Sequence, residues 1–159
     1  MISKCGVYRY VLHRQWNDGD KRVVFLMLNP STADATEDDP TIRRCVGYGQ
    51  DWGLDGLTVV NLFPLRATDP TELRAHQEPT EITKANLGYI ESECYWNRPE
   101  YVVCAWGTNG GLYRRDKIVL RALTELGTNL TVLKRNEDGS PAHPLYLRKN
   151  LKPIAWSGK

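Results

Sequence analysis

The sequence lacks the patterns that mark metal centres and membrane spans. It contains four cysteines and three histidines, but no C-x-x-C pair and no histidine at metal-ligand spacing from a cysteine. We therefore expect no metal and no cofactor, with the cysteines as free thiols in a reducing compartment. No segment reaches the roughly 18 to 20 apolar residues that cross a bilayer, so we expect a cytoplasmic protein with no membrane partner.

The sequence also has little net charge and no typical phosphate-binding loop. The formal net charge is only +2, so any role with nucleic acid has to depend on a local basic patch. The glycine-rich stretch at 107–111 carries neither a P-loop lysine nor G-x-G-x-x-G spacing, which predicts a simple turn from a strand to a helix. No repeat or linker interrupts the sequence, so we predict one domain over residues 1–159. No pattern specifies an oligomeric state.

Apolar runs alternate with amphipathic segments along most of the chain. This alternation is typical of βαβ units, and it predicts an α/β fold: three αβα layers around a mainly parallel central sheet of four to five strands. At the first helix, Asp39 is placed as the N-cap and Pro40 as the first helical residue. The apolar runs lie at 21–28, 56–63, 100–106 and 130–135, and helices are predicted at 39–53, 79–97 and 112–127.

The beginning of the chain predicts an antiparallel hairpin. The segment CGVYRYVLHRQW is followed by NDGD and then by the apolar run at 21–28. The Asp18-Gly19 pair is a strong signal for a two-residue turn, because glycine accepts the positive φ that such turns need. We therefore expect the first two strands to pair directly with each other.

Polar residues follow the internal apolar runs where each run ends. Asn29 begins the sequence Asn-Pro-Ser-Thr, Asn61 precedes Leu-Phe-Pro, and His143 follows the last run after a turn. Each residue taken alone also has a simpler explanation: Asn29 as part of a turn, Asn61 as an amide that satisfies loose backbone groups, and His143 as an ordinary surface or core histidine. Because the carboxyl ends of parallel strands meet at one edge of a sheet, we expect these side chains to lie together. An amide offers the donor and acceptor that read a nucleobase edge, and an imidazole can donate to an anion.

These motifs carry a resemblance to known families. The stretches LNPSTAD, DDPTIRRC, NLFPLRATDP, AWG and HPLYL resemble the domain-of-unknown-function 1643 family over nearly the whole chain. More distantly, the order of the motifs is similar to that of the uracil-DNA glycosylase superfamily, which implies a uracil-DNA glycosylase-like fold. By this resemblance Asn29 lies at the catalytic Asn of the water-positioning loop, Asn61 reads the base, and His143 lies in the leaving-group loop. The chain departs from the glycosylases after Pro144, where Leu145-Tyr146 replaces a second Ser-Pro.

Breaking an N-glycosidic bond requires a placed water on the sugar side and a donor to the departing base. We assign these roles to Asn29 and His143, with help from Asp34, although Asp34 is also explained as a helix cap or an Asx turn. Phe63 is expected to stack on the base, with Tyr48 and Trp52 as further walls. The residues expected to bind phosphate are Ser31, Thr32, Arg43, Arg66 and Arg148, with Arg44, Lys149 and Lys152 as further candidates.

Three functions remain open at this level. The first is a hydrolase that releases a modified base from DNA, or a related base-modifying transferase. The second is a non-catalytic binder of single-stranded or modified nucleic acid, which would show salt-dependent binding. The third is a site for a free nucleotide, since the weak net charge does not demand a polymer. All three share a DNA or nucleotide ligand as the partner.

Overall fold

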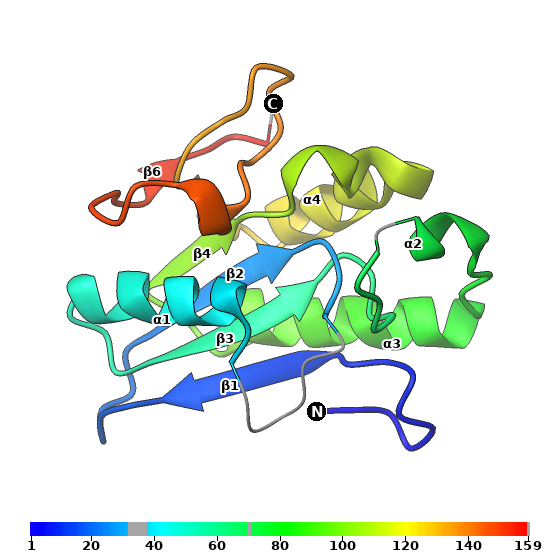
Figure 1. Ribbon diagram of the computed structural model, residues 1–159, viewed down its shortest axis with the longest axis horizontal. Helices are drawn as coiled ribbons and strands as arrows, with labels where there is room; N and C mark the ends of the chain where they lie inside the picture. The colour runs from blue at the N-terminus through cyan, green and yellow to red at the C-terminus, as the bar shows by residue number, and fades with distance from the viewer. Residues whose placement is uncertain (32–37, 70, 159) are drawn as a thin grey trace.

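The computed structural model describes residues 1–31, 38–69 and 71–158. A six-stranded sheet in the order β1-β3-β2-β4-β5-β6 forms its centre. Helix α1 covers one face, and α3 and α4 cover the other, so the chain has three layers (Figure 1). The strands are β1 (Val11–Gln15), β2 (Arg22–Met27), β3 (Gly56–Asn61), β4 (Tyr101–Cys104), β5 (Leu130–Val132) and β6 (Ile154–Ala155). The α-helices of the described residues are α1 (Pro40–Asp51), α2 (Glu72–Ala75), α3 (Thr80–Glu91) and α4 (Arg115–Glu125).

The four inner strands are parallel, as the alternating pattern predicted. Val23 of β2 pairs with Leu57 of β3 on one side and with Tyr101 of β4 on the other, and Cys104 pairs with Val132 of β5. Both faces of these strands are covered by helices, which explains why β2 and β3 read as continuous apolar runs. The prediction of a mainly parallel sheet is therefore confirmed, with six strands instead of four to five.

The predicted N-terminal hairpin is wrong, because β1 does not pair with β2. Strand β1 is antiparallel, as expected, but its neighbour is β3, with Val11 opposite Val60. Strand β2 lies between β3 and β4 and uses both of its edges for them. The loop at 16–21 instead packs on Asp55, just ahead of β3: the Trp16 N–H donates to its carbonyl at 3.0 Å and the Lys21 N–H to its carboxylate at 3.1 Å. The Asp18-Gly19 pair indicates a local bend of the chain, but it does not indicate which strands pair.

Two further segments differ from the sequence-based expectation. The glycine-rich stretch begins a 3₁₀-helical segment (Gly107–Arg114) instead of a simple turn. A Cβ on Gly110 would lie 2.2 Å from Trp106 Cδ1, so glycine is required there for the indole ring to pack. The short helix α2 and the two-residue strand β6, which pairs with β5, were not anticipated. Both are too short to produce a periodic pattern in the sequence.

The three buried cysteines belong to the hydrophobic core. Cys45, Cys94 and Cys104 are free and buried, and burial raises the pKa of each thiol, while Cys5 is free and exposed. Within the described ranges, no group of three or more His, Cys, Asp or Glu side chains is placed to hold a metal ion.

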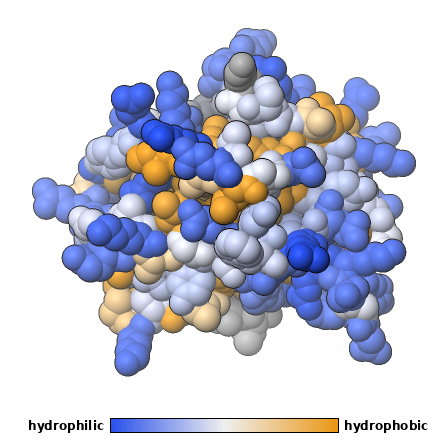
Figure 2. Space-filling view, turned by 180° about the vertical axis from the view of Figure 1, so that it is seen from behind, coloured by the Kyte–Doolittle hydropathy of each residue, from blue (hydrophilic) through white to orange (hydrophobic). Residues whose placement is uncertain are grey.

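Among the described residues, no helix combines the length and apolar character needed to cross a membrane. Figure 2 shows a mainly hydrophilic surface on the face opposite Figure 1, with smaller hydrophobic patches between charged side chains.

Candidate functional site

A cleft of about 340 Å³ lies at the carboxyl ends of β2, β3 and β4. This edge is where open parallel sheets bind their ligands. Three of the residues singled out in the sequence, Asn29, Asn61 and His143, line this one cleft, as does Ser31. The structure thus brings together side chains that are up to 114 positions apart, from Asn29 to His143. Other residues that line it include Arg9, Asp39, Thr41, Trp106 and Asn109.

Backbone hydrogen bonds join the loops that form the cleft. The Phe63 N–H donates to the Leu28 carbonyl at 2.9 Å, and the Ala67 N–H donates to the Pro30 carbonyl at 3.0 Å. These bonds continue the pairing of β2 and β3 beyond the ends of the strands. On the other side of the cleft, the Gly107 N–H donates to the Pro141 carbonyl at 2.9 Å. The loops are therefore held in a defined arrangement, which a preformed binding site requires.

Asn29 stabilises the turn and also offers an acceptor to the cleft. Its Nδ2 donates to the Ala67 carbonyl at 2.8 Å and to the Pro30 carbonyl at 3.2 Å. Its Oδ1 receives no hydrogen bond from the residues that the structure describes. The turn-forming role and the site role considered for Asn29 are thus compatible, because each uses a different atom of the amide.

Asn61 ends β3 and is only 3% exposed, yet its side-chain amide makes no hydrogen bond to any described residue. It shares a sheet face with Val59, so the amide points to the α1 side, where the cleft lies. The backbone at this position is held from the other side by Asn86 of α3, whose Nδ2 donates to the Asn61 carbonyl at 2.9 Å. Because the Asn61 side chain lines the cleft, its amide presents both a donor and an acceptor there.

Asn86 was not identified from the sequence as part of the site. It is 1% exposed, and its Nδ2 also donates to the Leu62 carbonyl at 3.2 Å. The signal for it was present, because an asparagine occupies the buried face of the amphipathic segment at 80–91. A polar residue in an apolar stripe indicates a specific partner, but the sequence does not identify the partner.

His143 is half-buried and its hydrogen bonding fixes its tautomer. The Leu145 N–H donates to Nδ1 at 3.4 Å, so Nδ1 is unprotonated and the proton of the neutral ring lies on Nε2. Burial lowers the pKa of His143, and the nearby carboxylate of Asp39 partly opposes this by raising it. The imidazole is thus neutral near pH 7, and its Nε2–H is the donor that it can offer in the cleft.

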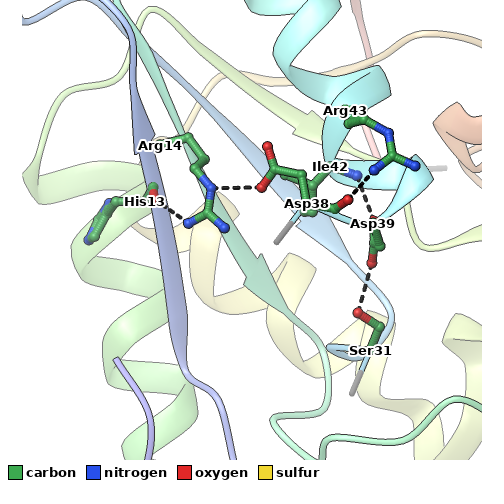
Figure 3. Close-up of polar contacts among 7 residues, drawn as sticks. All are labelled: His13, Arg14, Ser31, Asp38, Asp39, Ile42 and Arg43. Carbon is green, nitrogen blue, oxygen red and sulfur yellow. Dashed lines mark hydrogen bonds and ion pairs between the residues drawn. The ribbon is translucent and has the colours of Figure 1, made fainter. Parts of the chain in front are cut away.

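The structure adds Asp39, for which the sequence had predicted only a capping role. Its Oδ1 accepts from the Ile42 N–H at 2.8 Å, which confirms the N-cap, and its Oδ2 accepts from the Ser31 hydroxyl at 2.7 Å. Figure 3 shows the carboxylate between these two partners, with Asp38 held beside it by Arg14 at 2.7 Å and by Arg43. Of the described residues that line the cleft, Asp39 is the acidic one. Arg9, 4% exposed, is a cation of the cleft that the sequence reasoning also missed.

The three aromatic residues predicted as stacking walls, Phe63, Tyr48 and Trp52, do not line this cleft. Phe63 is 3% exposed in a separate pocket, and the guanidinium of Arg115 covers its ring at 4.7 Å. Strand β3 ends at Asn61, so strand alternation no longer places residue 63 on the same side as residue 61. Tyr48 is 1% exposed on α1, stacks on Trp52 and donates to the Arg148 carbonyl at 2.5 Å. The described aromatic side chains that do line the cleft are Trp106 and His143.

The predicted phosphate-binding residues fall in several places. Ser31 lines the cleft, and Arg43 lines a groove of about 440 Å³ between α1 and the segment 144–149, together with Arg44 and Lys149. Arg148 is exposed, and Lys152 is exposed beyond it. Arg66 donates to the Gly6 carbonyl at 3.0 Å and does not line the cleft. Thr32 and Asp34 lie outside the described residues.

The free energy of unfolding is expected to fall in acid because of His143. Burial lowers the pKa of His143 and of His13 below the ordinary value of 6.5, so in acid the unfolded chain binds protons that the folded chain does not. The free energy of unfolding should therefore rise with pH up to about 6.5 and then level off. His143→Gln should make this rise smaller, as measured by urea unfolding at pH 5 and pH 7.5. Identical pH profiles for both proteins would contradict the buried, neutral state of His143.

Comparison with known proteins identifies the family of the chain. No curated protein and no solved structure matches it at a significant level. A family model matches residues 9–145, and the family is described as protein of unknown function DUF1643. The match begins at the buried Arg9, which lines the cleft, and ends at Leu145, whose N–H donates to His143. Since this match covers most of the 159 residues, the chain belongs to the DUF1643 family.

Proposed function

We propose that the cleft binds a single nucleobase and that the protein hydrolyses the N-glycosidic bond of a modified base in DNA. The observation that carries the proposal is the amide of Asn61, a residue only 3% exposed whose amide makes no hydrogen bond to a described residue and which lines the same cleft as His143. A primary amide matches the donor and acceptor pattern of a base edge. The cleft volume of about 340 Å³ suits a small ligand. The motif order and the site at the carboxyl ends of parallel strands support a uracil-DNA glycosylase-like fold as part of this proposal.

The reaction needs a group on each side of the bond that breaks. As the bond between C1′ and the base nitrogen breaks, its electron pair moves to the base, and the His143 Nε2–H donates to the charge that develops there. Water adds to C1′, held by Asn29 Oδ1 as an acceptor, and its proton passes to the Asp39 carboxylate. Asp39 lines the cleft, and its Oδ1 caps the N-terminus of α1. The role that the sequence suggested for Asp34 stays a prediction.

The groove beside the cleft supports a polymer as the substrate. Pro40, which lines the groove, directly precedes the cleft residue Thr41 in the sequence. Leu145, which also lines the groove, lies two positions after the cleft residue His143. Arg43, Arg44 and Lys149 make the groove basic, and such side chains bind phosphates and release counterions. A base held in the cleft would therefore place its flanking phosphates in a basic groove.

Base release from oligonucleotides tests the proposal. The protein is incubated with strands that carry uracil, hydroxymethyluracil or other altered bases, and the products are measured by mass spectrometry. We expect release of one class of base, with a rate about 100- to 1,000-fold lower for His143→Ala, the loss typical of a removed anion donor. His13→Ala is the matched control, because His13 lies in a different pocket with Glu93 and Thr58. Equal rates for the two variants would overturn the role of His143.

A second candidate is a non-catalytic binder of single-stranded or modified nucleic acid, or of a free nucleotide. It is favoured by the state of Asp39, since both of its oxygens already accept a hydrogen bond and no other described carboxylate lines the cleft. A binder would retain altered strands without releasing a base. Its affinity for strands would fall steeply with salt, whereas a mononucleotide site would show little salt dependence.

A further inference from the structure

A second pocket, of about 400 Å³, lies on the α3 and α4 side of the sheet. Its walls come from the segments 63–65, 73–78 and 113–115, and it shares no lining residue with the cleft described above. Leu65 and Leu73 make part of its lining apolar, and another part is polar, with His76, Gln77, Glu78 and Arg115. An apolar pocket with a few fixed polar groups is the general form of a small-molecule site.

The polar wall of this pocket is a buried ion pair with unused hydrogen-bonding atoms. Arg115 Nη1 lies 3.0 Å from Glu78 Oε1, and the two side chains are 11% and 8% exposed. The same Oε1 accepts from the Thr83 hydroxyl at 2.6 Å. Among the described residues nothing donates to Glu78 Oε2, and Arg115 donates only through Nη1. The pair therefore presents an acceptor and a donor side by side in the pocket, with no net charge.

Aromatic rings form another wall of the pocket, and one of them is held by unusual backbone. The Arg115 guanidinium lies over the Phe63 ring at 4.7 Å, and Tyr113 meets that ring edge-on at 6.5 Å between centroids. Tyr113 and Arg114 have φ of 53° and 55°, in the left-handed region that non-glycine residues rarely adopt. The Tyr113 hydroxyl donates to the Arg74 carbonyl at 3.0 Å, which fixes the half-exposed ring beside the pocket.

We propose that this pocket binds a neutral planar ring whose edge carries an N–H next to a carbonyl, the lactam edge of guanine or hypoxanthine. The carboxylate of Glu78 would accept from the ring N–H and the guanidinium of Arg115 would donate to the carbonyl. The ring is neutral because the ion pair is already balanced and a further buried charge would be costly. It is planar because Tyr113 offers an aromatic surface for stacking. This binding does not depend on the activity proposed for the cleft.

Nucleoside binding to the full chain tests the proposal. Guanosine, inosine and adenosine are titrated by calorimetry, and we expect guanosine and inosine to bind at least tenfold more tightly than adenosine, whose edge has an acceptor at N1. Tyr113→Asn should weaken guanosine binding about tenfold, because asparagine tolerates the left-handed backbone but lacks the ring. Glu78→Gln should remove the preference for guanosine over adenosine, because an amide can place a donor where Oε2 lies.

The same titrations separate this pocket from the cleft. Asn61→Ala alters the cleft only, so it should leave guanosine binding unchanged if the second pocket is the site. Absence of guanosine binding, unchanged binding in both Tyr113→Asn and Glu78→Gln, or loss of binding in Asn61→Ala would each overturn the proposal. None of these results depends on base release from oligonucleotides. If no base is released in that experiment, the proposal for the second pocket still stands.

Discussion

Asn61→Ala is expected to weaken the binding of an altered oligonucleotide in the cleft about 30- to 150-fold, equivalent to about 2–3 kcal/mol, without lowering the free energy of unfolding. The amide of Asn61 is 3% exposed and no described residue hydrogen-bonds to it, so the folded protein loses no hydrogen bond to a described residue when the amide is removed. A ligand, in contrast, loses both a donor and an acceptor. The two effects are measured by titration with an altered oligonucleotide and by urea unfolding.

This pair of measurements separates a binding residue from a turn residue. If Asn61 only satisfied loose backbone groups at the end of β3, Asn61→Ala would destabilise the protein and leave binding unchanged. Asn97→Ala is the matched control, since Asn97 is exposed in the pocket of His13 and Glu93, away from the cleft. Asn86→Ala, unlike Asn61→Ala, should lower the free energy of unfolding, because the Asn86 side chain makes two hydrogen bonds within the protein.

Breaking the ion pair between Glu78 and Arg115 is expected to have the largest effect on stability. Glu78→Ala should lower the free energy of unfolding by about 3–5 kcal/mol, the usual cost of leaving one buried charge without its partner. The side chains are only 8% and 11% exposed, and Thr83 also loses its acceptor. Urea unfolding of Glu78→Ala, Arg115→Leu and the double variant measures the coupling between the two residues.

The double variant should be more stable than the sum of the two single effects indicates, because no charge is left unpaired in it. The exposed pair Arg121 and Glu125 on α4, with side chains 81% and 64% exposed, is the matched control, and Glu125→Ala should cause no measurable loss. Strictly additive effects at Glu78 and Arg115 would show that the pair contributes no more than a surface ion pair.

The sequence by itself determined most of the local elements and the edge of the sheet where the cleft lies. Apolar runs predicted the parallel strands β2 to β5, because strands covered on both faces need continuous apolar residues. Asp39 and Pro40 predicted the start of α1, since capping depends only on residues within one turn. Asn29, Asn61 and His143 could be placed on one edge because parallel strands must end on the same side.

The tertiary structure decided which elements and side chains meet. The neighbour of β1 is β3, since β2 already uses both of its edges, and a turn signal carries no information about strand order. Phe63 packs under Arg115 and Tyr48 under Trp52, so neither ring reaches the cleft. The second hydrogen bond of Asp39, to Ser31, and the support of Asn61 by Asn86 join distant segments. Such contacts depend on long-range burial, whereas sequence periodicity records only the local environment of each residue.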